Sequence, residues 1–342
     1  MTLRARWILI AVLSALALGA TAVVGAVAWA QYQQRQAAPS AVDTSEVVPT
    51  GDRVVFRNTA SGAGYGHVAS VPLGDPSGAR TISAIACDRV DATADLVSCL
   101  RSVRGIAPSY TATLYTGDGA EIAQWPLSGI PSRTRIAGDG SLISTTAFVT
   151  GHTYATIGFS TETTIHTPDG EGLGNLEEWT LLVDGAPTAP VDRNFWGVTF
   201  ADDDTFYATV GLTRDGTTHL VRGSISGRSM QVLDENVECP SLSPDGTRIA
   251  FKRVTAGSGP TVHWTPAIYD IGSGEVTLLP ESRSIDDQIE WLDDGTILYG
   301  MPRQGVAGDT DVWALAADGS GEPSVFLEHA WSPSVVREGR AP

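Results

Sequence analysis

The most constraining feature of this 342-residue sequence is a hairpin motif that recurs along it. Residues 239–252, CPSLSPDGTRIAFK, contain a Ser-Pro-Asp-Gly turn, followed by a stretch in which polar and apolar residues alternate. Pro presets φ, Asp accepts hydrogen bonds from its own backbone and Gly permits positive φ, so this tetrapeptide predicts a tight turn between two strands. Looser copies place the equivalent turn position at residues 51, 94, 140, 204, 246 and 295. One such hairpin per period is typical of a β-propeller or another repeat array.

Each of these hairpins is followed by a second kind of hairpin, best seen at residues 310–321, TDVWALAADGSG. It reads as a strand with Val312, Ala314 and Ala316 on one face, ending in an Asp-Gly turn. Weaker versions occupy residues 67–76, 113–119, 179–187, 219–227 and 267–275. Six hairpins of each kind supply four strands per repeat, which is the content of one propeller blade.

The two ends of the repeat region complement each other. Residues 329–334 match the first half of the hairpin motif, and residues 51–56 match its second half. The C-terminal and N-terminal strands are therefore expected to share one blade and to close a ring, which removes exposed strand edges. The sequence thus predicts an all-β fold, a six-bladed β-propeller over residues 50–336.

The pairing of SPDGTRIAF with TDVWALAADGSG resembles the β-propeller repeats of TolB-type proteins. In that family each blade carries a Ser-Pro-Asp-Gly turn and then a D-[IVL]-[WY] strand that ends in an Asp-Gly turn. The match is strong at residues 237–280 and 288–328, fair at 131–150, and weak at 84–103 and 195–212, where the turns lack Pro and Gly. The resemblance implies an extracytoplasmic interaction scaffold that uses no cofactor.

The N-terminus predicts export. Residues 7–30 carry no charge and follow Arg4 and Arg6. As a helix this run would be about 36 Å long, enough to span a bilayer with the C-terminal body outside the cytoplasm. A retained signal-anchor is favoured because the apolar run is longer than that of a usual signal peptide. A small-x-small pattern leaves cleavage after Ala30, and hence secretion, as the alternative.

Composition divides the chain into four parts. Residues 1–30 form the signal-anchor and transmembrane segment, and residues 31–49, rich in Gln, Ala, Ser and Pro, predict a flexible linker. Residues 50–336 form the propeller, and residues 337–342 are expected to be a frayed tail. The 39 acidic residues outnumber the 22 basic ones, with no basic patch, so binding of nucleic acid is excluded.

The cysteines suggest one disulfide. Cys87 and Cys99 lie symmetrically about the turn at residues 93–94, on what should be facing strands of one hairpin. Facing residues can be about 4.5 Å apart at Cα, near the short limit for a disulfide, and an exported body permits oxidation. A Cys87–Cys99 bond is therefore predicted, with two buried thiols as the alternative. Cys239 has no partner and is expected to be a core thiol.

Motifs for catalysis and metal binding are poor. The sequence has no GxSxG elbow, phosphate-binding loop, HExxH helix or Cys/His cluster. Structural roles are favoured for the six histidines, His67, His152, His166, His219, His263 and His329. Three aspartates at residues 202–204 could help to hold Ca²⁺, but a solvated acidic turn is favoured. No catalytic, cofactor-binding or metal-binding residue is therefore predicted.

Residues 157–178, IGFSTETTIHTPDGEGLGNLEE, fall in the longest interval between two turns. They predict an inserted loop, which is either a partner-contacting surface or a tolerated insertion.

The predicted function is that of a membrane-tethered scaffold that binds protein partners in the cell envelope without catalysis. The alternative is an extracytoplasmic hydrolase that acts on glycan or peptide through carboxylates at the central funnel. Two acidic side chains about 5–9 Å apart there would support the hydrolase. An apolar and aromatic lining would instead favour the binding module. A third reading is a sensor domain whose helix couples to a membrane partner.

Overall fold

The computed structural model describes residues 3–105, 107–149, 160–190, 192–212 and 216–339. It divides into two units, one comprising Met1–Val42 and Ala60–Tyr65, the other Asp43–Thr59 and Gly66–Pro342. The second unit is a six-bladed β-propeller, which confirms the predicted fold class.

The first unit contains the helix α1 (Leu3–Ala37), whose segment Leu3–Gln34 is long and apolar enough to cross a membrane. The helix continues past residue 30 because the sequence there, QYQQRQA, consists largely of good helix formers, and Pro39 prevents further extension. The flexible linker expected at residues 31–49 is therefore wrong for residues 31–37. It is also wrong for β1 (Thr44–Ser45), which pairs with a strand of the propeller.

The six sheets of the propeller are named here as blades A to F, with their strands listed from the ring centre outward. Blade A contains β27 (Ala330–Val336), β2 (Arg53–Asn58), β3 (His67–Pro72), β4 (Arg80–Ala86) and β1. Blade B contains β5 (Arg89–Ala92), β6 (Leu96–Val103), β7 (Ser109–Thr116) and β8 (Glu121–Pro126). Blade C contains β9 (Ile130–Ile136), β10 (Ile143–Val149), β11 (Ser160–His166) and β12 (Gly172–Asn175).

The remaining blades follow the same order. Blade D contains β15 (Arg193–Phe200), β16 (Thr205–Leu212), β17 (Thr217–Ser224), β18 (Ser229–Glu235), β13 (Thr180–Val183) and β14 (Ala186–Thr188). Blade E contains β19 (Glu238–Leu242), β20 (Arg248–Ala256), β21 (His263–Asp270) and β22 (Val276–Leu278). Blade F contains β23 (Glu290–Asp293), β24 (Thr296–Pro302), β25 (Thr310–Ala316) and β26 (Ser324–Leu327). The described part of the chain also has the 3₁₀ helices η1 (Leu176–Glu178) and η2 (Gly259–Thr261), both in connections between strands.

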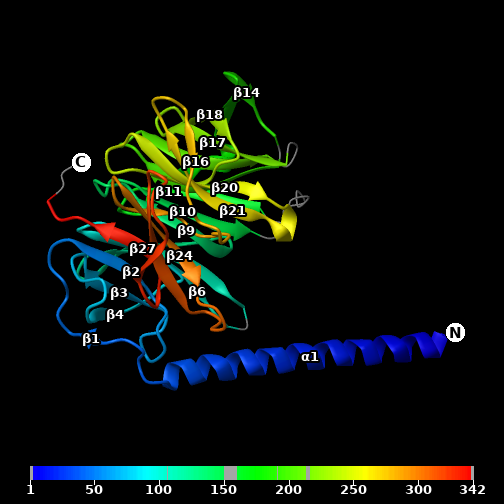
Figure 1. Cartoon of the computed structure of the whole chain (residues 1–342). Helices are drawn as coiled ribbons and strands as arrows, with labels where there is room; N and C mark the ends of the chain where they lie inside the picture. Colours follow the sequence, from blue (N-terminus) through cyan, green and yellow to red (C-terminus); the bar gives the residue numbers. More distant parts are fainter. Residues whose placement is uncertain (1–2, 106, 150–159, 191, 213–215, 340–342) are drawn as a thin grey trace. The chain divides into compact units, whose positions relative to one another are not determined.

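The ring is closed by the two ends of the chain. The innermost strands β27, β5, β9, β15, β19 and β23 contact one another in that order, and β23 contacts β27. In blade A, β2 pairs with β27 from Arg53 opposite Val336 to Asn58 opposite Ala330, so a strand from the start of the propeller sequence lies beside its last strand (Figure 1). The predicted pairing of complementary half-motifs is confirmed.

Among the described residues the hydrophobic core forms six clusters, each filling the space between two neighbouring blades. Strand β20 contributes side chains to two of these clusters. Ile249 and Phe251 pack with residues of blade D, whereas Ala250 between them packs with blade F. Successive side chains point to opposite faces of a strand, and both faces of a blade are covered by neighbouring blades. The strand therefore carries a continuous run of apolar residues.

The Ser-Pro-Asp-Gly turn forms as predicted. The Asp245 carboxylate accepts hydrogen bonds from the Ser243 hydroxyl and the Thr247 backbone N–H, at 2.6 and 3.0 Å. Gly246 has φ of 71°, the left-handed conformation that glycine adopts without strain.

The loop insertion expected at residues 157–178 is wrong for the described part of that segment. Most of it forms β11 and β12, the outer hairpin of blade C, and Leu176 is fully buried. The reason is a second Pro-Asp-Gly turn, in which the Gly170 N–H donates to the Thr167 carbonyl at 2.9 Å. The hairpin expected at residues 179–187 in this blade instead adds β13 and β14 to blade D, through parallel pairing of β13 with β18.

The tail expected at residues 337–342 is wrong for its first two residues. Arg337 forms an ion pair of 2.9 Å with Asp52 and donates to the Leu292 carbonyl at 2.7 Å. Glu338 pairs with Arg53 at 2.9 Å. These contacts extend the closure of the ring beyond β27.

Candidate binding site at the start face of the ring

The propeller has two faces that differ in their connections. The six inner strands begin at one face, called here the start face, and end at the other, the turn face. The Ser-Pro-Asp-Gly and Asp-Gly turns lie on the turn face, because they follow the first and the third strand of a blade, and both of these strands run from the start face to the turn face. The start face carries the connections between blades.

Arg135 bridges the centre of the ring. It lies on β9 of blade C, and its guanidinium pairs with Glu290 on β23 of blade F, which is the opposite blade of the ring. The same group lies 3.4 Å from the Asp91 carboxylate on β5 and donates to the Ile289 carbonyl at 3.1 Å. Arg135, Asp91 and Glu290 are called the axial bridge below. A side chain that reaches from one blade to its opposite fills the ring centre at this level.

The two acids of the axial bridge are engaged in structural hydrogen bonds. Asp91 accepts from the Ile136 N–H at 2.7 Å, and Glu290 accepts from the Val335 N–H at 3.1 Å. Burial raises the pKa of Asp91 to about 6, although the attraction of Arg135 works in the opposite direction. Asp91 is only 4% exposed.

A second layer of charges lies nearer the start face. Arg89, the first residue of β5, pairs with Asp287 at 2.8 Å, and its guanidinium lies 4.9 Å above the Trp331 ring. Asp287 is fully buried and also accepts from the Gly300 N–H at 3.0 Å. A Cβ at Gly300 would come within 2.4 Å of Trp331, so only glycine fits beneath this group.

Lys252 of β20 belongs to the same layer. Its ammonium is buried and lies 2.7 Å from Asp286, 3.9 Å from Glu238 and 4.6 Å from the centre of the Trp264 ring. Glu238 also accepts from the Trp264 indole N–H at 3.0 Å. Asp286 is the solvent-facing member, since its side chain is 69% exposed.

Cys239 and Arg133 complete this layer. Cys239 is 1% exposed, has φ of 53°, and its side chain interacts with the Arg133 guanidinium. The prediction that Cys239 stays a free thiol agrees with the structure. The start layer is defined here as Arg89, Arg133, Lys252, Cys239, Glu238, Asp286 and Asp287.

Apolar side chains are exposed at the same face. Ile130, at the start of β9, is 52% exposed and lies opposite Phe148 of β10, which is 38% exposed. Val103, at the corresponding end of β6, is 45% exposed. The start face therefore combines charged groups with exposed aliphatic and aromatic groups.

The ring centre matches neither lining expected from the sequence. It is not mainly apolar, because the axial bridge and the start layer are charged. Its acids are not a free pair either, because Asp91 and Glu290 share Arg135.

The cysteine pair differs in geometry from the prediction. The structure joins Cys87 to Cys99 by a disulfide with Cα atoms 5.4 Å apart. Cys99 faces Val90, however, and Cys87 lies before β5, where its N–H donates to the Gly66 carbonyl. The bond therefore links the connection between blades A and B to the second strand of blade B, instead of crossing one hairpin.

His329 and the acidic turn at residues 202–204 make structural hydrogen bonds. His329 lies between Asp309, 2.9 Å from Nδ1, and Arg303, 3.1 Å from Nε2. Since Arg303 can only donate, Nε2 accepts and Nδ1 donates to Asp309. In the acidic turn, Asp202 accepts from the Thr205 N–H and Asp204 from the Ser226 N–H. No group of acids, histidines and cysteines suited to a metal occurs within the described ranges; His152 lies outside them.

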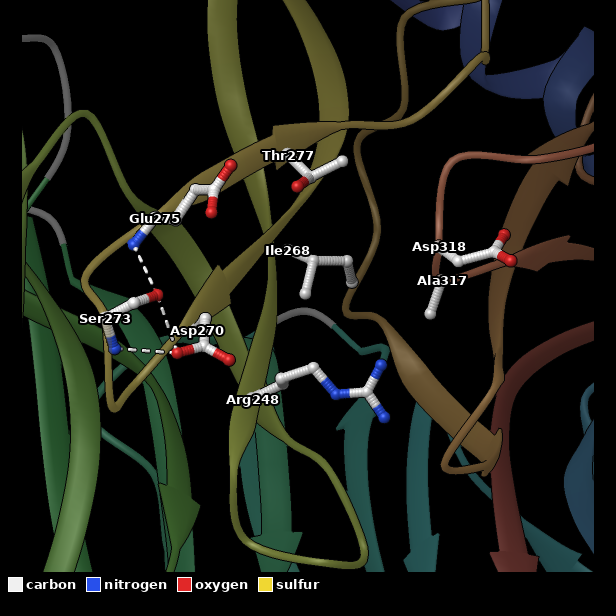
Figure 2. A pocket seen from close by; sticks show the side chains of 8 residues that line it. All are labelled: Arg248, Ile268, Asp270, Ser273, Glu275, Thr277, Ala317 and Asp318. Carbon is white, nitrogen blue, oxygen red and sulfur yellow. Dashed lines mark hydrogen bonds between the residues drawn. The ribbon is translucent and has the colours of Figure 1, made fainter.

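A shallow groove of about 240 Å³ lies between blades E and F at the turn face. Figure 2 shows Arg248 extending between the Asp270–Glu275 turn on one side and Asp318 on the other. The groove is small and mainly polar, whereas ligand pockets are usually larger and apolar. It does not resemble a binding pocket for a small molecule.

Sequence reasoning missed the charged residues of the ring centre. One available signal was the repeat position, because Arg135, Ser241 and Glu290 each lie five residues before the turn glycine of their blade. Opposite charges at one repeat position in opposite blades predict a pair across the axis.

Comparison with known proteins shows which solved structures share this fold. The sequence matches no protein-family model and no curated protein. Among solved structures, TolB from Acinetobacter baumannii matches with a TM-score of 0.56 and 16% identity, over 84% of this chain and 68% of TolB. A puromycin-hydrolyzing peptidase from Mycobacterium tuberculosis matches with a TM-score of 0.48 and 12% identity, over 83% of this chain and 44% of the peptidase. Likeness at such identities concerns the fold alone, and the chain has a TolB-like six-bladed β-propeller fold.

Proposed function

We propose that this chain is an extracytoplasmic, membrane-tethered propeller that binds a protein partner of the cell envelope through its start face, without catalysis. The observation that carries the proposal is the composition of that face. Exposed Ile130 and Phe148 lie on the same face as a charged layer that includes the solvent-facing Asp286. Aromatic and aliphatic groups beside charged ones are typical of protein interfaces. The apolar helix α1 supports the tether.

The hydrolase alternative has less support. General acid–base catalysis requires carboxyl groups that can reach the substrate and exchange protons with it. Asp91 and Glu290 are instead held by Arg135 and by backbone N–H groups, deep in the ring. The likeness to a peptidase noted above concerns a chain that this protein covers by less than half.

Site-specific photo-crosslinking in intact cells tests the proposal. A photoreactive residue is placed at Asp286 on the start face, or at Asp118 on an exposed turn of the turn face, in the full-length chain. Crosslinked protein products are expected from position 286 and not from position 118. Products from position 118 alone, or none from either position under conditions where the chain is expressed and folded, would contradict the proposal.

The location is tested separately. Protease added to intact spheroplasts is expected to digest the propeller, because Arg4 and Arg6 precede the apolar run and favour a cytoplasmic N-terminus. A protected propeller would overturn the topology.

A further inference from the structure

Arg133 differs from the other two cations of the start layer in its lack of a close carboxylate. Arg89 and Lys252 each lie within 2.8 Å of an aspartate oxygen. Arg133 has no carboxylate within 4.0 Å among the described residues, and its residue surface is only 8% exposed. Its Nη1 donates to the neighbouring Ser132 carbonyl at 2.9 Å and its guanidinium interacts with the Cys239 side chain, while its Nε is buried without a hydrogen-bond partner.

Burial disfavours the charged form of the Arg133 guanidinium; the nearby Asp286 and Asp287 offset this and raise its pKa, but they give its Nε no hydrogen-bond acceptor. A buried donor without an acceptor destabilises the folded state, and more so when the group is charged. Buried polar groups are nearly always satisfied, so such an exception calls for an acceptor that is absent from the chain itself. The surrounding layer reaches solvent through Asp286, whose side chain is 69% exposed, and through Arg89, whose side chain is 16% exposed.

We propose that Arg133 and its start-layer neighbours form a binding site for a single carboxylate group, which accepts hydrogen bonds from the Arg133 guanidinium. A planar carboxylate matches the fork of N–H donors that a guanidinium presents. Arg89 and Lys252 add positive potential on either side. The site extends the proposed function by naming a chemical group recognised at the start face, but it does not depend on a protein partner.

The charge of the layer selects a carboxylate over a phosphate. Three cations, Arg89, Arg133 and Lys252, are balanced by Asp286, Asp287 and Glu238, so the whole layer is neutral. A dianion would meet repulsion from Asp286 and Asp287, both of which interact electrostatically with Arg133. A monoanion can be neutralised by Arg133 alone, the one cation of the layer that has no carboxylate within 4.0 Å among the described residues.

Titration of the full-length protein in detergent with sodium acetate tests the site. Melting temperature and tryptophan fluorescence are followed at constant ionic strength, with sodium chloride in place of acetate as the reference. The wild type is expected to melt at higher temperature in acetate, and Arg133→Gln is expected to bind acetate at least about tenfold more weakly, as for loss of a charge-assisted hydrogen bond. Arg222→Gln, which removes an exposed arginine of blade D, should leave the acetate response unchanged.

Two peptides separate the sources of the carboxylate. Pentaglycine and its C-terminal amide differ only in the presence of the terminal carboxylate. A response to pentaglycine and not to its amide, lost in Arg133→Gln, would assign the site to a peptide terminus, whether or not acetate binds. A response to acetate alone would assign it to small carboxylates.

Equal responses of the wild type and Arg133→Gln, or no response to either probe, would overturn the proposal. Near-ultraviolet circular dichroism of the variant shows that it is folded. Arg133→Lys keeps the charge without the planar fork, and provides a second variant if Arg133→Gln does not fold. The crosslinking pattern at position 286 is an independent readout, so the carboxylate site and the proposed partner face can fail separately.

Discussion

Replacing Arg135 with methionine removes the only cation of the axial bridge while keeping a side chain of similar length. Asp91, which is 4% exposed, and Glu290, whose side chain is 13% exposed, then remain as two acids at the ring centre without their shared counter-ion. Breaking a buried ion pair by removing one partner costs about 3–5 kcal/mol, because an uncompensated charge stays behind. At about 2 °C per kcal/mol for a domain of this size, the melting temperature should fall by about 6–10 °C.

The loss of stability in Arg135→Met should depend on pH, and the pKa of Asp91 determines the direction. Its pKa is raised to about 6, chiefly by burial, from an ordinary value of 3.8. The folded state therefore holds this proton more tightly than the unfolded state, and stability from this group falls as the pH rises from about 4 to about 6. Without Arg135 the pKa of Asp91 rises further, so at pH 5 the variant keeps the acid neutral and avoids part of the penalty.

The measurement compares melting temperatures of the wild type and Arg135→Met at pH 5 and pH 8, by circular dichroism of the full-length protein in detergent. The difference between the two proteins should be larger at pH 8. Arg222→Met, at an exposed position of blade D, serves as the matched control and should shift stability by less than about 0.5 kcal/mol. The triple variant Arg135→Met, Asp91→Asn, Glu290→Gln should recover much of the loss, since no charge is left buried.

Two results would refute the reasoning. A loss no larger than that of the control would mean that the bridge contributes no net stability. A loss of the same size at both pH values would mean that Asp91 does not titrate with the raised pKa.

Two further predictions concern chain closure and thiols. Deleting residues 328–342 removes β27 and the Glu328 and His329 carbonyls to which Arg80 donates at 2.9 and 3.0 Å, so the protein should become insoluble or melt far below the wild type. Unchanged melting would show that β27 is dispensable for the ring. Denatured, unreduced protein should contain one reactive thiol, that of Cys239, because Cys87 and Cys99 are joined. Three reactive thiols would contradict the disulfide.

The blades could be predicted from the sequence because local chemistry determines them. The turn at residues 243–246 forms where Pro, Asp and Gly stand together, and alternating residues such as Ile249, Ala250 and Phe251 require cover on both faces of a strand. Closure could be predicted because β27 and β2 each carry half of the same motif.

The errors arose where two segments offered the same local signal. Residues 167–170 and residues 184–185 both supply a turn that contains Asp-Gly, and sequence alone did not show which hairpin completes blade C. Parallel pairing of β13 with β18 resolves the choice in favour of blade D, and it depends on an edge that exists only once the blade is formed.

The charged residues at the ring centre could not be predicted from local signals, because their contacts exist only in the closed ring. Arg135 and Glu290 are separated by 155 residues and lie on opposite blades. In an unclosed array these two side chains would face solvent, and each would be an unremarkable polar residue on an edge strand. Closure brings six inner strands around one axis and turns such residues into buried partners. One of the buried cations, Arg133, has no carboxylate within 4.0 Å among the residues that the structure describes. Ring closure, which stabilises the fold, thus also buries the Nε donor of Arg133 without a partner on the start face. Substitutions at Arg135 should therefore change the stability of the ring, whereas substitutions at Arg133 should change carboxylate binding.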